Sequence, residues 1–176
     1  SLTGLTKLRA SHNALEGNLP SLSAVCQQLT YLRLNNNKFS GSLPDDWRAC
    51  VKVTTLSVSD NQLSGELPAV WAEMVSLTSL YLYSNQLTGT LPSEWSSMTQ
   101  LTDLELYSNK FTGTLPSAWS NMKQLTDLEL NGNQLTGTLP TAWSSMMKLR
   151  YLFFKFKSID GYIAICLVKH DSIVDA

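Results

Sequence analysis

Hydrophobic and polar positions along this chain follow a pattern that returns every 24 residues, and the clearest copy runs from Leu101 to Gln124. Each copy has leucine or a similar residue at its first, fourth and sixth positions, and an asparagine at its ninth. Within the Leu-x-Leu part the period is two, which predicts a short strand with both leucines on one side. One copy cannot bury these leucines alone, so we expect an α/β solenoid in which coils stack and each contributes one parallel strand.

The pattern divides the chain into a repeat array, residues 1–152, and a remainder, residues 153–176. Six regular copies begin at residues 5, 29, 53, 77, 101 and 125, with no insertion between them. A seventh copy begins at residue 149, but Phe154, Lys157 and Ala164 replace its leucine, asparagine and proline. Residues 153–176 are therefore either a degenerate last repeat or a tail that is not native to the parent protein. Since the chain opens without methionine, we expect it to be a piece of a longer protein with further repeats.

Three other columns of the repeat predict structural roles. The asparagine after each strand can satisfy backbone groups that have lost their strand partners, so we expect a buried column formed by Asn13, Asn37, Asn61, Asn85, Asn109 and Asn133. A glycine separated by one residue from each Leu-Pro pair predicts a turn, and the following Trp-x-x-Met predicts a short helical turn. The tryptophans suit either a carbohydrate platform or core packing, and their recurrence at an inward position favours the core for Trp47, Trp71, Trp95, Trp119 and Trp143.

Two motifs within the repeat resemble known proteins. The stretches Asn85 to Pro92, Asn109 to Pro116 and Asn133 to Pro140 resemble the plant-type, extracellular class of leucine-rich repeats. Their continuations, LPSEWSSM, LPSAWSNM and LPTAWSSM, are similar to the Leishmania-type promastigote surface antigens and the repeat part of the proteophosphoglycans of trypanosomatids. The resemblance implies a leucine-rich-repeat horseshoe with its short parallel strands on the concave face.

The resemblance also implies a function. It implies a non-enzymatic protein-recognition module, a fragment of a cell-surface or secreted surface antigen that binds host or partner proteins, including a host-cell receptor. The alternative within the same repeat class is the sensing ectodomain of a receptor kinase, or an inhibitor of an extracellular hydrolase. No signal peptide or anchor is visible in this sequence, so the surface localisation is what the resemblance implies.

Composition and charge exclude several other functions. The chain is 43% hydrophobic and 15% charged with a net charge of -1, which is typical of a globular domain and gives no basic excess for nucleic acid. Its longest apolar run, Ile163 to Val168, is much shorter than the roughly 20 residues of a membrane-spanning helix. His12 and His170 lie at opposite ends of the array, where neither can serve a common nucleophile. We therefore expect no enzymatic activity, cofactor, metal or direct membrane insertion.

Cys26 and Cys50 occupy the same position in adjacent copies. Their Cα atoms should lie about 5 Å apart, a distance that a disulfide tolerates. Cysteine is also commonly buried as a small hydrophobe, and here it stands in place of a core methionine. We favour two buried free thiols, with the disulfide as the alternative.

The outward residues of the strands form the candidate binding surface. They change along the array from basic through aromatic to acidic, and we select Arg9, Arg33, Tyr81, Tyr83, Tyr107, Asp103, Glu105, Asp127 and Glu129. Stacking carboxylates of adjacent copies within about 5 Å costs stability unless a cation or a basic partner offsets it. Tyrosine is enriched in protein interfaces, which favours protein binding over a merely solvated sheet whose charges were copied by duplication. Calcium between the acidic pairs is a weaker alternative, because flat strands lack a wrapped oxygen cage.

Overall fold

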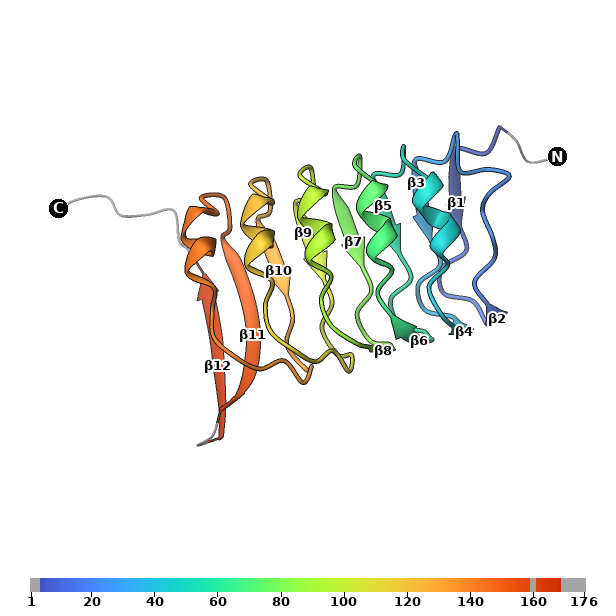
Figure 1. Ribbon diagram of the computed structural model, residues 1–176. Coiled ribbons are helices and arrows are strands. Elements are labelled where there is room, and N and C mark those ends of the chain that lie inside the picture. The colour runs from blue at the N-terminus through green and yellow to red at the C-terminus, as the bar shows by residue number, and fades with distance from the viewer. Residues whose placement is uncertain (1–3, 159–160, 169–176) are drawn as a thin grey trace.

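The computed structural model describes residues 4–158 and 161–168. Successive coils lie side by side along one axis, with strands on one side and short helices on the other (Figure 1). This is the predicted repeat solenoid, with one short parallel strand in each coil.

The main sheet has eight strands in the order β1-β3-β5-β7-β9-β10-β11-β12. They are β1 (Lys7–Arg9), β3 (Tyr31–Arg33), β5 (Thr55–Ser57), β7 (Ser79–Tyr81), β9 (Asp103–Glu105), β10 (Asp127–Glu129), β11 (Tyr151–Ser158) and β12 (Gly161–Val168). All pairs from β1 to β11 are parallel and in register, so that Leu56, Leu80 and Leu104 are aligned and fully buried. This register fixes which outward side chains become neighbours.

A second sheet that the sequence reasoning did not predict lies at the turns after β1, β3, β5 and β7. It contains β2 (Glu16–Asn18), β4 (Lys38–Gly41), β6 (Gln62–Glu66) and β8 (Gln86–Thr88). The repeated glycine lies at this turn with a positive φ, for example 79° at Gly89, as the pattern predicted. A Cβ atom on Gly89 would also lie 2.8 Å from the Glu66 side chain of the preceding coil. Both conditions favour glycine here.

Five short helices follow the Leu-Pro pairs on the other side of the solenoid. They are η1 (Asp45–Ala49), η2 (Ala69–Glu73), η3 (Ser93–Ser97), η4 (Ser117–Asn121) and η5 (Thr141–Ser145), and all are 3-10 helices. A proline precedes each one and a methionine or cysteine ends it, so there is room for little more than one turn. The helical turn was predicted, but its 3-10 geometry was not.

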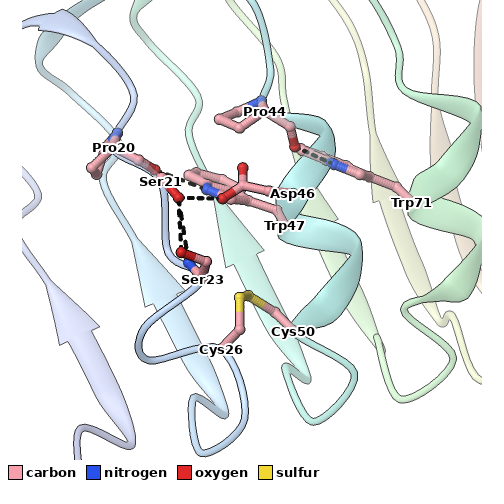
Figure 2. Close-up of a disulfide and its surroundings, with 9 residues drawn as sticks. All are labelled: Pro20, Ser21, Ser23, Cys26, Pro44, Asp46, Trp47, Cys50 and Trp71. Atoms are coloured by element: carbon pink, nitrogen blue, oxygen red, sulfur yellow. Dashed lines mark hydrogen bonds between the residues drawn. A yellow bond between two sulfur atoms is a disulfide. The ribbon is translucent and has the colours of Figure 1, made fainter. Parts of the chain in front are cut away.

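The tryptophans of these helices form a continuous stack in the core. Their rings are nearly parallel, with centroids 5.8 to 6.5 Å apart in successive coils. Each indole N–H also donates a hydrogen bond to the proline carbonyl of the preceding coil, as Trp47 does to Pro20 and Trp71 does to Pro44 (Figure 2). The exposed fraction of the five side chains is at most 5%, so the rings offer no carbohydrate platform.

The asparagine column links each coil to the one before it. The amide of Asn109 donates to the carbonyls of Leu82, Leu106 and Tyr107, and its oxygen accepts the backbone N–H of Leu87. Asn85 makes the equivalent contacts, and both residues are buried. Asn37, Asn61 and Asn133 are only partly buried, and Asn13 departs furthest from the expectation of a buried column. Its side chain is exposed and contacts only its own coil, because the structure contains no coil before it.

Cys26 and Cys50 form a disulfide, so our preference for free thiols was wrong (Figure 2). Their Cα atoms lie 4.2 Å apart, and both side chains are buried. Because the coils stack in register, equivalent positions of the first two copies come within bonding distance. The bond joins the first coil, which has Ser23 at the tryptophan position, to the first coil that has a tryptophan.

Strands β11 and β12 do not follow the path of the preceding coils. β11 and β12 pair antiparallel, from Tyr151 opposite Val168 to Ser158 opposite Gly161, and form a hairpin at the end of the main sheet (Figure 1). The division between residues 1–152 and 153–176 remains a prediction. His170 lies outside the described residues.

Candidate protein-binding surface

The concave surface is the exposed side of the main sheet, formed by residues on either side of the buried leucines. The register of β7, β9 and β10 places Tyr81 beside Glu105, Glu105 beside Glu129, and Asp103 beside Asp127. Arg9 and Arg33 are neighbours on β1 and β3. The structure therefore separates the nine selected residues into a basic group at one end and an aromatic and acidic group near the other.

The basic group is built around an aromatic ring that we did not select. The guanidinium carbons of Arg9 and Arg33 lie 4.6 and 5.0 Å from the ring centroid of Tyr31. Such cation–π contacts hold both side chains over the sheet and leave their N–H groups for a ligand. Together with His12 and Asn35 these residues line a hollow of about 310 Å³. The signal for Tyr31 was available, since it lies in an outward column of the strands, beside the column that holds Arg9 and Arg33.

Tyr83 and Tyr107 form a stacked pair two residues beyond their strands. Their ring centroids are 4.5 Å apart and the planes differ by 5°. Both rings are partly exposed, and they provide a rigid apolar surface with polar hydroxyls. Burial, followed by the nearby Tyr83 and carboxylates, raises the pKa of Tyr107 to about 12. The Tyr107 hydroxyl is therefore protonated at neutral pH.

Tyr81 lies on β7, between the basic pair of β1 and β3 and the acidic residues of β9 and β10. With Arg33, Tyr83 and Glu105 it lines a shallow hollow of about 220 Å³. Burial raises the pKa of Tyr81, the hydrogen bond to Ser79 lowers it, and the nearby acidic groups raise it further. Its phenol also remains neutral and able to donate.

The two carboxylate pairs differ in their local partners. Asp103 accepts a hydrogen bond from Thr102 at 2.5 Å, and Asp127 accepts one from Thr126 at 2.6 Å. We did not select these threonines, although they precede the aspartates in both copies. In contrast, neither glutamate side chain has a hydrogen-bond or ion-pair partner among the side chains that the structure describes, which end at Phe154.

Burial and neighbouring acids make the glutamates costly to ionise. Burial, followed by Glu129, Asp103 and Asp127, raises the pKa of Glu105 from 4.5 to about 7. Burial, followed by Asp127, also raises the pKa of Glu129. Among the side chains that the structure describes, the one ion pair is Arg48–Glu73, on helices η1 and η2, and no basic group of these side chains neutralises Glu105 or Glu129. A cation brought by a ligand would do so.

Two further observations describe the chemistry of this surface. Over residues 4–158 and 161–168, no three His, Cys, Asp or Glu side chains gather closely enough to hold a metal ion. Asn131 follows Tyr107 in the same outward column, and its Oδ1 atom is buried with no hydrogen-bond partner among the described residues. It provides one unused acceptor beside the tyrosine pair.

Comparison with known proteins identifies the family. The sequence profile described as "Leucine rich repeat" matches residues 27–87 and 99–156. The chain belongs to the leucine-rich repeat family. A search of curated proteins finds no match.

Solved structures with the same fold include plant receptor ectodomains. The leucine-rich-repeat ectodomain of the Arabidopsis thaliana receptor kinase GASSHO1/SCHENGEN3, solved with CASPARIAN STRIP INTEGRITY FACTOR 2, is 35% identical over 85% of this chain, with a TM-score of 0.82. The Arabidopsis receptor kinase HAESA, solved with the peptide hormone IDA and the co-receptor SERK1, is 33% identical over 88% of this chain, with a TM-score of 0.77. A plant ice-binding protein is 25% identical over 88% of this chain, with a TM-score of 0.71.

This leucine-rich repeat chain spans only part of those proteins. It covers 18% of the GASSHO1 ectodomain chain, 26% of the HAESA chain and 59% of the ice-binding protein. No helix in its described ranges is long and apolar enough to cross a bilayer.

Proposed function

We propose that this chain is the ligand-binding part of an extracellular leucine-rich repeat protein, a non-enzymatic module of the receptor-ectodomain type. Its concave surface binds an extended peptide or protein segment that carries basic side chains. The observation that carries the proposal is the pairing of Glu105 with Glu129 beside the stacked rings of Tyr83 and Tyr107.

The electrostatics support a basic ligand. Glu105 and Glu129 are held side by side by the sheet register and are half removed from water, and neither has a cationic partner among the side chains that the structure describes. A lysine or arginine placed between them would favour their ionised forms and so lower the raised pKa of Glu105. The ligand would thereby relieve a repulsion that the fold itself leaves in place.

The aromatic residues support an extended polypeptide rather than an isolated cation. Tyr81, Tyr83 and Tyr107 add apolar area beside the acids, and buried tyrosines at interfaces often dominate binding energy. Arg9 and Arg33 lie at the other end of the same surface. This order of charge gives a bound segment a direction, with its basic residue at β9 and β10 and any acidic group toward β1 and β3.

The proposal can be tested by selecting ligands from a random peptide library on the immobilised chain. We expect enrichment of lysine or arginine next to an apolar residue, and affinity that falls as the salt concentration rises. Tyr107→Ala should weaken the selected peptides roughly tenfold or more, since anchoring aromatics often contribute more than ~1.4 kcal/mol.

A matched pair of charge variants provides the control. Glu105→Gln with Glu129→Gln removes two carboxylates from the concave surface, whereas Glu66→Gln with Glu94→Gln removes two from β6 and η3. Only the first pair should lose basic peptides. Equal loss in both variants, or enrichment of acidic peptides, would refute the assignment of the binding surface.

The trypanosomatid surface-antigen hypothesis uses the same surface but a different parent protein. It rests on the LPSEWSSM, LPSAWSNM and LPTAWSSM motifs, and its partner would be a host protein, such as a receptor on a host cell. The receptor type is supported by the solved ectodomains. Sequencing the parent open reading frame separates the two, since a kinase domain downstream indicates a receptor and a Ser/Thr/Pro-rich stalk with a lipid-anchor signal indicates an antigen.

Ice binding is a second candidate, favoured by one feature of the outer edge. Exposed Thr-Gly-Thr segments recur in three consecutive coils, at Thr88 to Thr90, Thr112 to Thr114 and Thr136 to Thr138. They form a regular array of methyl and hydroxyl groups. A thermal-hysteresis measurement tests this function, and an unchanged freezing point in the presence of the protein would exclude it.

A further inference from the structure

A polar hollow lies in the concave surface where the coil of β5 carries small side chains. Ser57 ends β5 and Ser59 follows it, and their exposed fractions are only 5% and 0%. The equivalent positions of the two neighbouring coils carry larger side chains, which flank the serines on both sides. We name this hollow of about 220 Å³ the β5 notch, and its lining consists of Arg33, Asn35, Ser57, Tyr81, Tyr83 and Glu105.

Two hydrogen-bond donors meet at the floor of the β5 notch. Arg33 lies beside Ser57 in the parallel register of β3 and β5. The Arg33 guanidinium has no acidic partner among the side chains that the structure describes, and it can only donate. Ser57 and Ser59 share one hydrogen bond, with 3.3 Å between their hydroxyl oxygens, so one of their two O–H groups is left over. When Ser59 donates to Ser57, the Ser57 hydroxyl can donate to a ligand beside Arg33.

Tyr83 gives the notch an apolar wall. One face of its ring is covered by Tyr107 of the next coil, with ring centroids 4.5 Å apart. The preceding coil has Ser59 at the equivalent position, so no ring of that coil covers the other face, which is turned toward the notch. An acidic side chain suits this combination, because its methylene stem can pack on the ring while its two oxygens accept hydrogen bonds at the floor.

The sheet also fixes how far the notch lies from the pair Glu105 and Glu129. These glutamates are on β9 and β10, two and three strands beyond β5. At ~4.8 Å per strand, the separation is roughly 10 to 14 Å. Four residues of an extended polypeptide span about 13 Å, and residues four apart point to the same side because the period is two. Residues three apart would point to opposite sides.

We propose that the β5 notch binds the carboxylate side chain of an aspartate or glutamate in the ligand, four residues from the lysine or arginine that lies between Glu105 and Glu129. The carboxylate accepts hydrogen bonds from the Arg33 guanidinium and the Ser57 hydroxyl, and its stem packs on Tyr83. Glu105 is on the far side of the notch, where the basic residue of the ligand compensates its charge. This inference rests on the proposed function and adds a sequence motif for the ligand.

Isothermal titration calorimetry of the full chain with synthetic peptides can test this subsite. The probes are acetylated and amidated peptides of equal length and composition, each with one glutamate and one arginine, so that the glutamate side chain supplies the only carboxylate. The two residues are placed two, four or six positions apart, in either order. We expect a peptide with a spacing of four to bind about tenfold more tightly than the others, and to lose this advantage when glutamine replaces its glutamate.

A matched pair of variants locates the carboxylate. Arg33→Gln and Arg9→Gln each remove one guanidinium that lies over the Tyr31 ring, but only Arg33 lines the notch. The preference for the glutamate peptide over its glutamine counterpart should persist in Arg9→Gln and disappear in Arg33→Gln. Ser57→Ala should reduce the preference about fivefold, the effect of one hydrogen bond. Each result is a ratio of two affinities for the same variant, so a partial loss of stability does not imitate it.

The outcomes distinguish this subsite from the proposed function. Absence of binding by every peptide would remove both. Binding that requires arginine but does not depend on the position of glutamate would overturn the subsite alone, and so would an equal loss of the glutamate preference in Arg9→Gln and Arg33→Gln. Tighter binding of a peptide whose free C-terminal carboxylate replaces the glutamate at the same spacing would show that the notch holds a chain end, and the side-chain assignment would be wrong.

Discussion

The buried asparagine column makes a prediction whose size follows from the contacts of Asn109. Asn109→Asp keeps the size and shape of the side chain but replaces an NH₂ group by an oxygen. The two N–H bonds of that group serve the carbonyls of Leu82, Leu106 and Tyr107, at 3.1 to 3.3 Å. In the variant, an oxygen that carries negative charge faces these three acceptors.

The expected cost is about 4 kcal/mol. Each buried group left without its hydrogen bond costs roughly 1–3 kcal/mol, and two donated bonds are lost. The aspartate is also buried next to carbonyl oxygens, so its pKa should lie above the ordinary value. Protonation restores one donor, and the cost should shrink as the pH falls through that raised pKa.

Urea unfolding followed by tryptophan fluorescence measures this cost, because all five indoles are buried. Asn121→Asp on η4 is the matched control, since it makes the same chemical change at an exposed position. The difference in unfolding free energy between the two variants should be about 4 kcal/mol at pH 8 and smaller at pH 4. A difference below ~1 kcal/mol, or one that does not depend on pH, would refute the structural role assigned to the column.

Three further predictions concern other parts of the fold. Replacing both Cys26 and Cys50 by serine should lower the free energy of unfolding by about 3 kcal/mol, because the disulfide closes a loop between residues 24 apart in sequence. Equal urea midpoints for the variant and the oxidised wild type would contradict the disulfide. Trp119→Phe should lower the free energy of unfolding by about 2 kcal/mol, because it removes buried ring area and the 2.8 Å hydrogen bond to the Pro92 carbonyl. Thermal unfolding measures this loss, and a stability equal to wild type would argue against the hydrogen bond. Glu105 has a folded-state pKa of about 7, above its ordinary 4.5, so the folded protein holds this proton more tightly and loses stability as the pH rises between these values. Glu105→Gln should therefore gain stability relative to wild type across that window in urea titrations, and a constant difference from pH 4 to pH 9 would show that the pKa is not raised.

The periodic columns of the core could be predicted from the sequence for a physical reason. In-register stacking places equivalent residues of successive coils in the same environment. Leu104, Trp119 and Asn109 therefore each belong to a column whose members share one burial state and one set of contacts. The same regularity placed Tyr81 and Glu105 on the outward side of the strands. One residue alone seldom shows whether its side chain points inward or outward, whereas a column of equivalent residues does.

Features that occur once, or that depend on exact local geometry, could not be read in this way. The 3-10 geometry depends on the short distance between proline and methionine. The expected Cα separation of about 5 Å between Cys26 and Cys50 did not decide their state, because two buried thiols and a disulfide both fit it. Tyr31 and Thr102 were overlooked because their roles lie in contacts with neighbouring charges. The antiparallel pairing of β11 with β12 occurs once in the chain, so no column of equivalent residues could indicate it.

The bond from each indole to the proline one coil earlier makes the array modular in length. If residues 101–124 were deleted, Trp143 could stack on Trp95 and bond to Pro92 through the same contacts that other neighbours use. The core would lose one unit without a defect, yet Tyr107 and Glu105 would vanish and Tyr83 would meet Asn131 instead. Gain or loss of whole units by recombination can therefore rewrite the ligand preference of such a protein in a single step while its folding remains intact.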